Sequence, residues 1–211
     1  IGGGNVSDNP RLRAVVDKAL NANMTRDTID RAIARGSGSA ESENLEELTY
    51  EGYGPGGVAI LCQTLTDNKN RTVAEVRHGF SKYGGSLGTS GSVSYLFTQT
   101  GIISFASHVS EEEIMEHALD AGAHDIVVTA DSIDVMTTLE NFGAVQDSLK
   151  DAGIESVSAE MTMLASSEID LNLGDAEKLL QLIEHLEDLD DVQNVFSNAK
   201  FSADIIAKFQ I

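Results

Sequence analysis

The spacing of apolar residues predicts two short helices at the start of the chain. The first carries an apolar stripe that repeats every three or four residues and consists of Leu12, Val15, Val16, Ala19 and Leu20. Asn9 is suited to cap this helix and Pro10 to occupy its first position. A second helix is expected from Thr25 to Gly36, followed by a polar linker over 37–44. This arrangement favours a plain helical hairpin over a helix-turn-helix.

After the linker, the pattern alternates between strands and helices. Strands are predicted over Leu48–Tyr53 and Val58–Thr66, joined by a turn at Gly54–Gly57. Residues 69–82 follow as a basic amphipathic helix that Gly84 and Gly85 are predicted to end. Ser92–Phe97 is predicted to be the next strand.

Residues 101–165 predict a complete β-α-β-β-α-β order. The helix opened by Ser110 has a capping box with Glu113 and is predicted to end at Gly122. The other predicted elements are the strands Ile102–Phe105, Ile126–Thr129, Ile133–Leu139 and Val157–Leu164, and the helix Phe142–Ala152. This is the ferredoxin-like, split βαβ order, in which helices cover one face of an antiparallel sheet.

The tail adds one helix and the strand Val192–Phe196, too few elements for a domain of their own. We expect 166–211 to return to the sheet begun after the linker, because that region lacks its last helix and strand. The predicted class is α+β, with a helical domain over 1–44 and a discontinuous α/β domain over 45–100 plus 166–211. The ferredoxin-like domain, 101–165, would be inserted in the latter.

Charge divides the chain unevenly. Residues 1–85 carry ten basic and eleven acidic residues, whereas residues 86–211 carry four basic and twenty-three acidic residues, a net charge of −19. Such an acidic half repels phosphate, so we expect nucleic-acid contacts in the first 85 residues and water or protein partners on the acidic half. The candidate nucleic-acid-binding residues are Arg11, Arg13, Lys18, Arg26, Arg31, Arg35, Lys69, Arg71, Arg77 and Lys82.

One glycine-rich turn is a candidate for phosphate contact. Gly84, Gly85 and Ser86 follow Lys82, and successive backbone N–H groups in such a turn can form an anion-binding nest. A purely structural turn is the alternative.

The sequence offers little support for catalysis, a cofactor or a metal site. The five histidines lack ligand spacing such as HExxH, and no residue pairs with Cys62 as a nucleophile would require. Apolar runs are too short for a membrane span and no signal peptide is visible. The single Cys62 suits a reducing compartment, so we expect a cytoplasmic protein. Because the chain starts at Ile1 instead of Met, we expect it to be a trimmed form.

Several motifs resemble the signature of the YebC/PmpR family of transcriptional regulators. They are Asn9-Pro10-Arg11-Leu12-Arg13, Asn23-Met24, Ile33-Ala34-Arg35-Gly36, Tyr50-Glu51-Gly52-Tyr53-Gly54-Pro55-Gly56-Gly57, Asp67-Asn68, Asn70-Arg71-Thr72, Val76-Arg77, Phe80, Lys82, Gly84-Gly85, Leu87-Gly88, Gly91-Ser92-Val93 and Phe97. The resemblance implies one helical and two α/β domains in a cytoplasmic DNA-binding regulator. It also implies kinship with a mitochondrial translational activator. Family members begin with a basic Gly-His-Ser-Lys-Trp segment that is absent before Ile1 here.

We therefore expect a non-enzymatic regulator of gene expression that contacts DNA phosphates through the helical domain and the 69–82 helix. The alternative is a translation factor that uses the same basic surface on ribosomal or messenger RNA. The sequence leaves the oligomeric state open.

Overall fold

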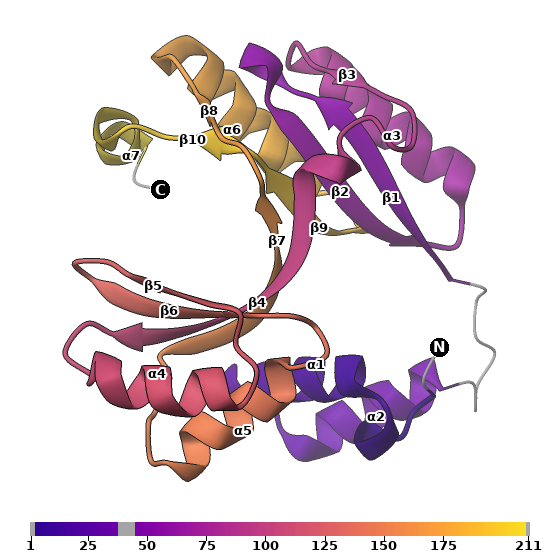
Figure 1. Cartoon of the computed structure of the whole chain (residues 1–211). Coiled ribbons are helices and arrows are strands. Elements are labelled where there is room, and N and C mark those ends of the chain that lie inside the picture. Colours follow the sequence, from indigo (N-terminus) through magenta and orange to yellow (C-terminus); the bar gives the residue numbers. More distant parts are fainter. Residues whose placement is uncertain (1–2, 38–44, 210–211) are drawn as a thin grey trace. The chain divides into compact units, whose positions relative to one another are not determined.

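The computed structural model describes residues 3–37 and 45–209 of the protein (Figure 1). They fall into two compact units. The first combines the described residues up to 37 with 99–162, and the second combines 45–98 with 163–209. Each unit is described by itself below.

A helical hairpin opens the first unit. Helix α1 spans Pro10–Asn21 and helix α2 spans Arg26–Gly36, as the apolar spacing predicts. The side chain of Asn9 accepts a hydrogen bond from the backbone N–H of Leu12, at 3.1 Å, and so caps α1. Between the helices Asn23 adopts a left-handed φ of 61°, which asparagine tolerates better than most residues. Most of the predicted linker lies outside the described residues.

The rest of the first unit is a four-stranded antiparallel sheet with two helices on one face (Figure 1). Its strands stand in the order β5-β6-β4-β7, which is the ferredoxin-like order. Their bounds are Phe97–Ala106 for β4, Asp125–Val128 for β5, Ser132–Thr137 for β6 and Ser158–Ala165 for β7. The helices are α4, Glu111–Asp120, and α5, Phe142–Asp151. The buried core between sheet and helices consists of Ile103, Phe105, Ile114, Ala118, Ile133, Val135, Phe142, Val145, Leu149 and Ile154.

Local signals set the ends of α4. The Ser110 hydroxyl accepts from the backbone N–H of Glu113, and Gly122 follows the helix with a φ of 99°. Both ends agree with the sequence prediction, because caps and helix-ending glycines act within a few residues.

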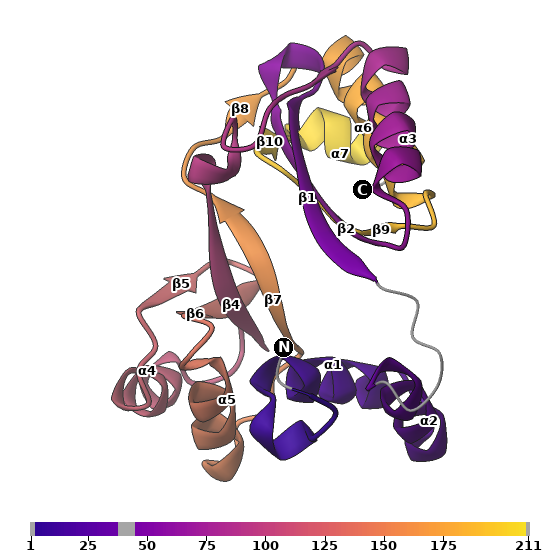
Figure 2. The ribbon, with the colours of Figure 1, turned by 90° about the vertical axis from the view of Figure 1, so that its right-hand side faces the viewer.

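The second unit is built on another four-stranded sheet, in the order β3-β1-β2-β9. Figure 2 shows its strands β1, β2 and β9. The strands are β1, Glu46–Tyr53; β2, Ala59–Thr66; β3, Ser86–Leu87; and β9, Val192–Ser197. Helices α3, Lys69–Lys82, and α6, Leu173–Glu187, pack on one face. The buried core on that face contains Val58, Ile60, Cys62, Val76, Phe80, Leu171, Ala176, Leu179, Leu182, Leu186 and Ile205.

Strand β9 pairs antiparallel with β2, with Cys62 opposite Val195. The strand predicted over Val192–Phe196 therefore joins the sheet begun by β1. The division into three domains, with 101–165 as an insertion, stays a prediction.

Three small elements near the C-terminal end were not predicted. They are β8, Ile169–Asp170, β10, Ala199–Lys200, and helix α7, Ala203–Phe209. Strands β8 and β10 pair in parallel, and two residues per strand give no periodic signal to read.

The predicted strand Ser92–Phe97 is wrong. Residues Ser94–Leu96 form a 3-10 turn, η3, and strand β4 begins at Phe97. The backbone N–H groups of Val93 and Ser94 both point at the Glu51 carboxylate, and an extended strand cannot aim two successive N–H groups at one acceptor.

Candidate nucleic-acid interface

Helix α3 carries four of the predicted cations, and a polar cluster fixes its start. Asn68 caps the helix by accepting from the backbone N–H of Arg71, at 3.2 Å. The hydroxyl of Thr66 accepts from the backbone N–H of Asn68 and from the hydroxyl of Thr72. The end of β2 is thereby tied to the first turn of α3.

Arg71 is held by carboxylates instead of standing free on the helix. Its guanidinium donates to both carboxylate oxygens of Asp191, with the shortest N–O distances at 2.7 and 2.9 Å. It also forms an ion pair with Asp67 at 2.8 Å. The Asp191 side chain is only 10% exposed and accepts from the hydroxyls of Thr66 and Thr72 as well. Arg71 thus joins α3 to the segment that precedes β9.

These contacts perturb the acid–base behaviour of the pair. Burial by itself would raise the pKa of the Asp191 carboxyl, but the hydrogen bonds from Arg71, Thr72 and Thr66 outweigh it and lower that pKa. The hydrogen bonds to Asp191 and Asp67 raise the pKa of Arg71. Because the folded pKa of Asp191 is depressed, its contribution to stability is present above the unfolded pKa near 3.8 and is lost as the pH falls below it.

Replacing Asp191 with alanine should lower the free energy of unfolding by about 3 kcal/mol, because two buried hydroxyls and a guanidinium lose a shared acceptor. Urea unfolding at pH 7 measures this loss. As a control, Asp190 is an exposed carboxylate next in the chain, and Asp190→Ala should stay within about 0.5 kcal/mol of wild type. Equal effects of the two substitutions would contradict a structural role for the Arg71–Asp191 pair.

The other cations of α3 differ in how they are engaged. Lys69 pairs with Glu46 of β1, and both side chains are exposed. The ammonium of Lys82 lies over the ring of Tyr83, 4.9 Å from its centroid. Arg77 is exposed and makes no ion pair within the described part of the chain. Arg77 and Lys82 are therefore the cations of α3 that remain most available to an external anion.

All six predicted cations of the hairpin are exposed. Arg31 pairs with Asp27 one helical turn earlier, and Arg13 donates to the backbone carbonyl of Ser7. Among the described residues, Lys18, Arg26 and Arg35 make no ion pair. The other three cations of the hairpin, Arg11, Arg13 and Arg31, each have an interaction within the chain. An exposed ion pair on a helix contributes only a few tenths of a kcal/mol, so Arg31 can exchange Asp27 for a phosphate at low cost.

The turn after α3 has a structural role. Gly84 adopts a φ of 82°, and the N–H of Gly85 donates to the carbonyl of Phe80, which closes the helix end. A Cβ on Gly85 would stand 2.6 Å from the Tyr53 carbonyl oxygen, and Ser86 pairs with Tyr53 in the sheet. The Gly85 N–H is thus already used, and phosphate contact at Gly84, Gly85 and Ser86 stays a prediction.

An anion-binding nest does exist further along, and the chain itself fills it. The Glu51 carboxylate, on a residue only 5% exposed, accepts from the backbone N–H groups of Gly91, Val93 and Ser94 at 2.7 to 2.8 Å. We call this arrangement the Glu51 nest. Burial by itself would raise the pKa of Glu51, but these three hydrogen bonds lower it. Sequence analysis missed the role of Glu51; the one available signal was a lone acidic residue within an otherwise strand-like run.

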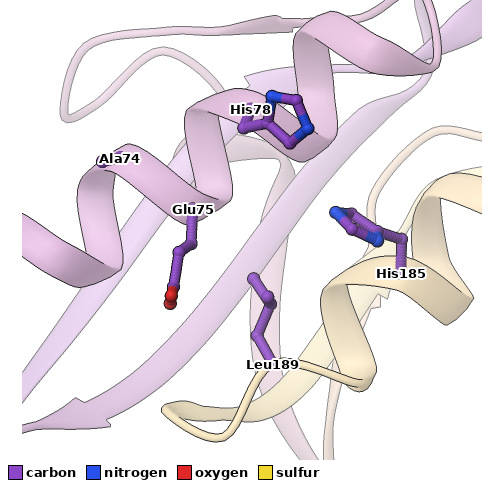
Figure 3. Close-up of a pocket in the computed structure, with 5 residues that line it drawn as sticks. All are labelled: Ala74, Glu75, His78, His185 and Leu189. Atoms are coloured by element: carbon purple, nitrogen blue, oxygen red, sulfur yellow. The ribbon is translucent and has the colours of Figure 1, made fainter.

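A hollow of about 310 Å³ lies between α3 and α6, lined by Ala74, Glu75, His78, His185 and Leu189 (Figure 3). The two imidazole rings meet edge to face, with their centroids 6.3 Å apart and their planes at 66°, while the Glu75 carboxylate points away from them. In the part of the chain that is described, no group of three or more His, Cys, Asp or Glu residues is arranged to hold a metal ion. No described helix is long and apolar enough to cross a membrane.

Comparison with known proteins shows which family the chain belongs to. The family model described as "TACO1/YebC protein N-terminal domain" matches residues 1–39, and that described as "TACO1/YebC second and third domain" matches residues 45–199. The chain belongs to the YebC/PmpR family. The resemblance found in the sequence motifs is thereby confirmed. Those motifs include Glu51 with two of its three amide donors, Gly91 and Val93, and they also include Arg71.

Relatives of the YebC/PmpR family match nearly the whole chain. A probable transcriptional regulatory protein of Idiomarina loihiensis is 57% identical over 208 residues, which cover 98% of this chain and 84% of the relative. The transcriptional regulatory protein PmpR of Pseudomonas aeruginosa is 59% identical over the same share of each chain. The crystal structure of a conserved hypothetical protein of Aquifex aeolicus superimposes with a TM-score of 0.82 at 42% identity, covering 97% of this chain and 85% of that one. The relatives support a regulatory role.

Proposed function

We propose that this chain is a non-enzymatic regulator that binds nucleic acid, most of all DNA, through the phosphates facing α1, α2 and the exposed side of α3. The observation that carries the proposal is the set of exposed cations without an ion pair among the described residues: Lys18, Arg26 and Arg35 on the hairpin and Arg77 and Lys82 on α3. These five cations belong to a protein with a net charge of −20. The names of the relatives support regulation of transcription.

Phosphate contact is the mode of binding that this surface favours. Lysine and arginine on exposed helix faces neutralise phosphates and release counterions, which makes affinity fall steeply with salt. Such contacts position a protein on nucleic acid without reading its sequence. We therefore expect residues 1–211 to bind duplex DNA with a Kd of about 10⁻⁴ to 10⁻⁶ M at physiological salt, the range of non-specific binding.

Binding through phosphates gives the exposed cations, the Arg71–Asp191 pair and the acidic surfaces different roles. The cations supply affinity, the ion pair of Arg71 with the buried Asp191 holds α3 in place, and the acidic α/β surfaces face water or protein partners. The buried Cys62 fits a reducing compartment such as the cytoplasm.

Crosslinking the protein to nucleic acid in cells, followed by sequencing of the attached DNA and RNA, tests the proposal. Recovery of promoter DNA supports a transcriptional regulator. Recovery of ribosomal or messenger RNA alone replaces that function with translation, the alternative that the same cations would serve. A protein that crosslinks to neither contradicts both.

A further inference from the structure

Tyr95 is exposed far more than an aromatic side chain usually is. It lies in the η3 turn and is 72% exposed, in a chain with only 5% aromatic residues and no tryptophan. A solvated ring on an anchored backbone offers a flat apolar face that a ligand can cover at little entropic cost.

The backbone that carries Tyr95 is anchored on both sides. On the N-terminal side, the Glu51 nest holds the N–H groups of Val93 and Ser94. On the C-terminal side, the N–H of Leu96 donates to the Val93 carbonyl, and the N–H of Ser166 donates to the Leu96 carbonyl at 2.7 Å. Each of these bonds fixes the backbone within one or two residues of Tyr95, so its ring projects from a preorganised turn.

The side chains on either side of the turn are anchored too. Val93 and Phe97 are buried in a small core with Ala59 and Leu61 of β2. Tyr95 lies midway between these two buried residues, and rotating the turn to cover its ring would pull them out of that core. Its exposure is therefore a consequence of the fold.

The turn also lies in the least acidic stretch of the chain. No Asp or Glu occurs between Glu75 and Glu111, and Arg77 and Lys82 fall within that interval. Glu51, the carboxylate that accepts hydrogen bonds from this loop, is enclosed by three amide groups. A polyanion that approaches Tyr95 therefore meets no acidic side chain from residues 76–110.

We propose that Tyr95 is a stacking platform for an unpaired base of a single-stranded nucleic acid. The proposal rests on the function proposed above and narrows its ligand. In a duplex the base faces are already covered by their neighbours, whereas an unpaired base of DNA or RNA can stack on an exposed aromatic ring. Tyr53 supports the same loop by donating its hydroxyl to the carbonyl of Ser92, at 3.0 Å.

The absence of tryptophan makes a direct test available. In the Tyr95→Trp variant of the whole chain, the only tryptophan stands at the proposed platform. Short oligo-dT and oligo-U strands should quench its fluorescence, and a mixed-sequence duplex should not. Binding of fluorescently labelled strands, followed by anisotropy, should weaken about 5- to 150-fold in Tyr95→Ala, as expected for one lost base stack. Tyr95→Phe keeps the ring and should bind within about twofold of wild type.

Val157→Trp provides the matched control, because Val157 is 74% exposed and belongs to the other compact unit, just before β7. The fluorescence of this control should not respond to any strand. A second outcome is that labelled single strands bind while the fluorescence of Tyr95→Trp and the affinity of Tyr95→Ala both stay unchanged. That result would show that Tyr95 does not stack on a base, and it would leave the proposed function intact. Equal quenching by the duplex would also overturn the single-strand assignment. If no DNA or RNA binds at all, the proposed function fails and the platform fails with it.

Discussion

Replacing Glu51 with alanine should lower the free energy of unfolding by about 3–5 kcal/mol, because three amide N–H groups lose a charged acceptor that is itself almost fully buried. The groups affected belong to Gly91, Val93 and Ser94, which precede strand β4. Urea unfolding followed by circular dichroism measures the loss. Hydrogen exchange at these three amides should also become faster, since the bonds that protect them are gone.

The variant Glu51→Gln separates charge from shape. One carboxylate oxygen accepts from both Val93 and Ser94, so a glutamine carbonyl placed there keeps two hydrogen bonds. Its amide group then faces the N–H of Gly91, two donors in contact, and the variant should lose about half as much stability as alanine. A loss below about 1 kcal/mol in the alanine variant would show that water replaces the carboxylate and that the nest is not closed.

Acid should remove the same contribution. The folded pKa of Glu51 lies below its ordinary value, near 4.5, so the stabilisation is complete above that pH and declines as the pH falls through it. The difference in unfolding free energy between wild type and Glu51→Gln should therefore be constant from pH 7 to about 5 and shrink below it. Asp191 also loses its contribution to stability in acid, but it does so equally in wild type and in Glu51→Gln, so that loss cancels in the difference. A difference that grows with acid would contradict the direction of the shift.

The helices and most strands could be predicted because their signals are local. The cap of α1 at Asn9, the cap of α4 at Ser110 and the glycine ends of α3 and α4 act within one helical turn. The ferredoxin-like order followed from the succession of elements in 101–165. The return of β9 to β2 followed from counting which region lacked elements, an argument of topology.

The contacts of the buried carboxylates Glu51 and Asp191 could not be predicted, because they join residues that are far apart in the sequence. Glu51 meets Gly91 across 40 positions, and Asp191 meets Arg71 across 120. From helical spacing, Arg77 lies beside the apolar stripe and is the more natural candidate to pair with a carboxylate, whereas the structure pairs Arg71. Only the fold shows that one is held by carboxylates while the other stays exposed.

The contrast between the paired Arg71 and the exposed Arg77 changes which residues are the best candidates for nucleic-acid contact. Charge counting treats all ten basic residues of the first 85 alike, whereas the structure pairs Arg71 with Asp191 and leaves Arg77 and Lys82 exposed. On the hairpin all six cations are exposed, although Arg13 and Arg31 have partners within it, and their contact with nucleic acid stays a prediction.

Neutralising Lys18, Arg26 and Arg35 with glutamine should therefore weaken binding to duplex DNA on the order of 10²-fold at 0.1 M salt. Each phosphate contact contributes about 0.9 to the slope of log K against log salt, or about eightfold in affinity at that concentration. The slope should fall by roughly two to three units in this variant and by roughly one to two units in Arg77→Gln with Lys82→Gln. Affinity measured between 0.05 and about 0.2 M salt gives both values.

The acidic half supplies the control, since three of its four lysines, Lys150, Lys178 and Lys208, make no ion pair among the described residues. Changing these three to glutamine alters the net charge as much as the hairpin variant does. Long-range attraction alone would make the two triple variants equally weak, but charges further apart than about 8 Å are largely screened at physiological salt. We expect the control to keep the slope of wild type. A control that loses as much slope as the hairpin variant would mean that net charge, and not contact by α1 and α2, governs binding.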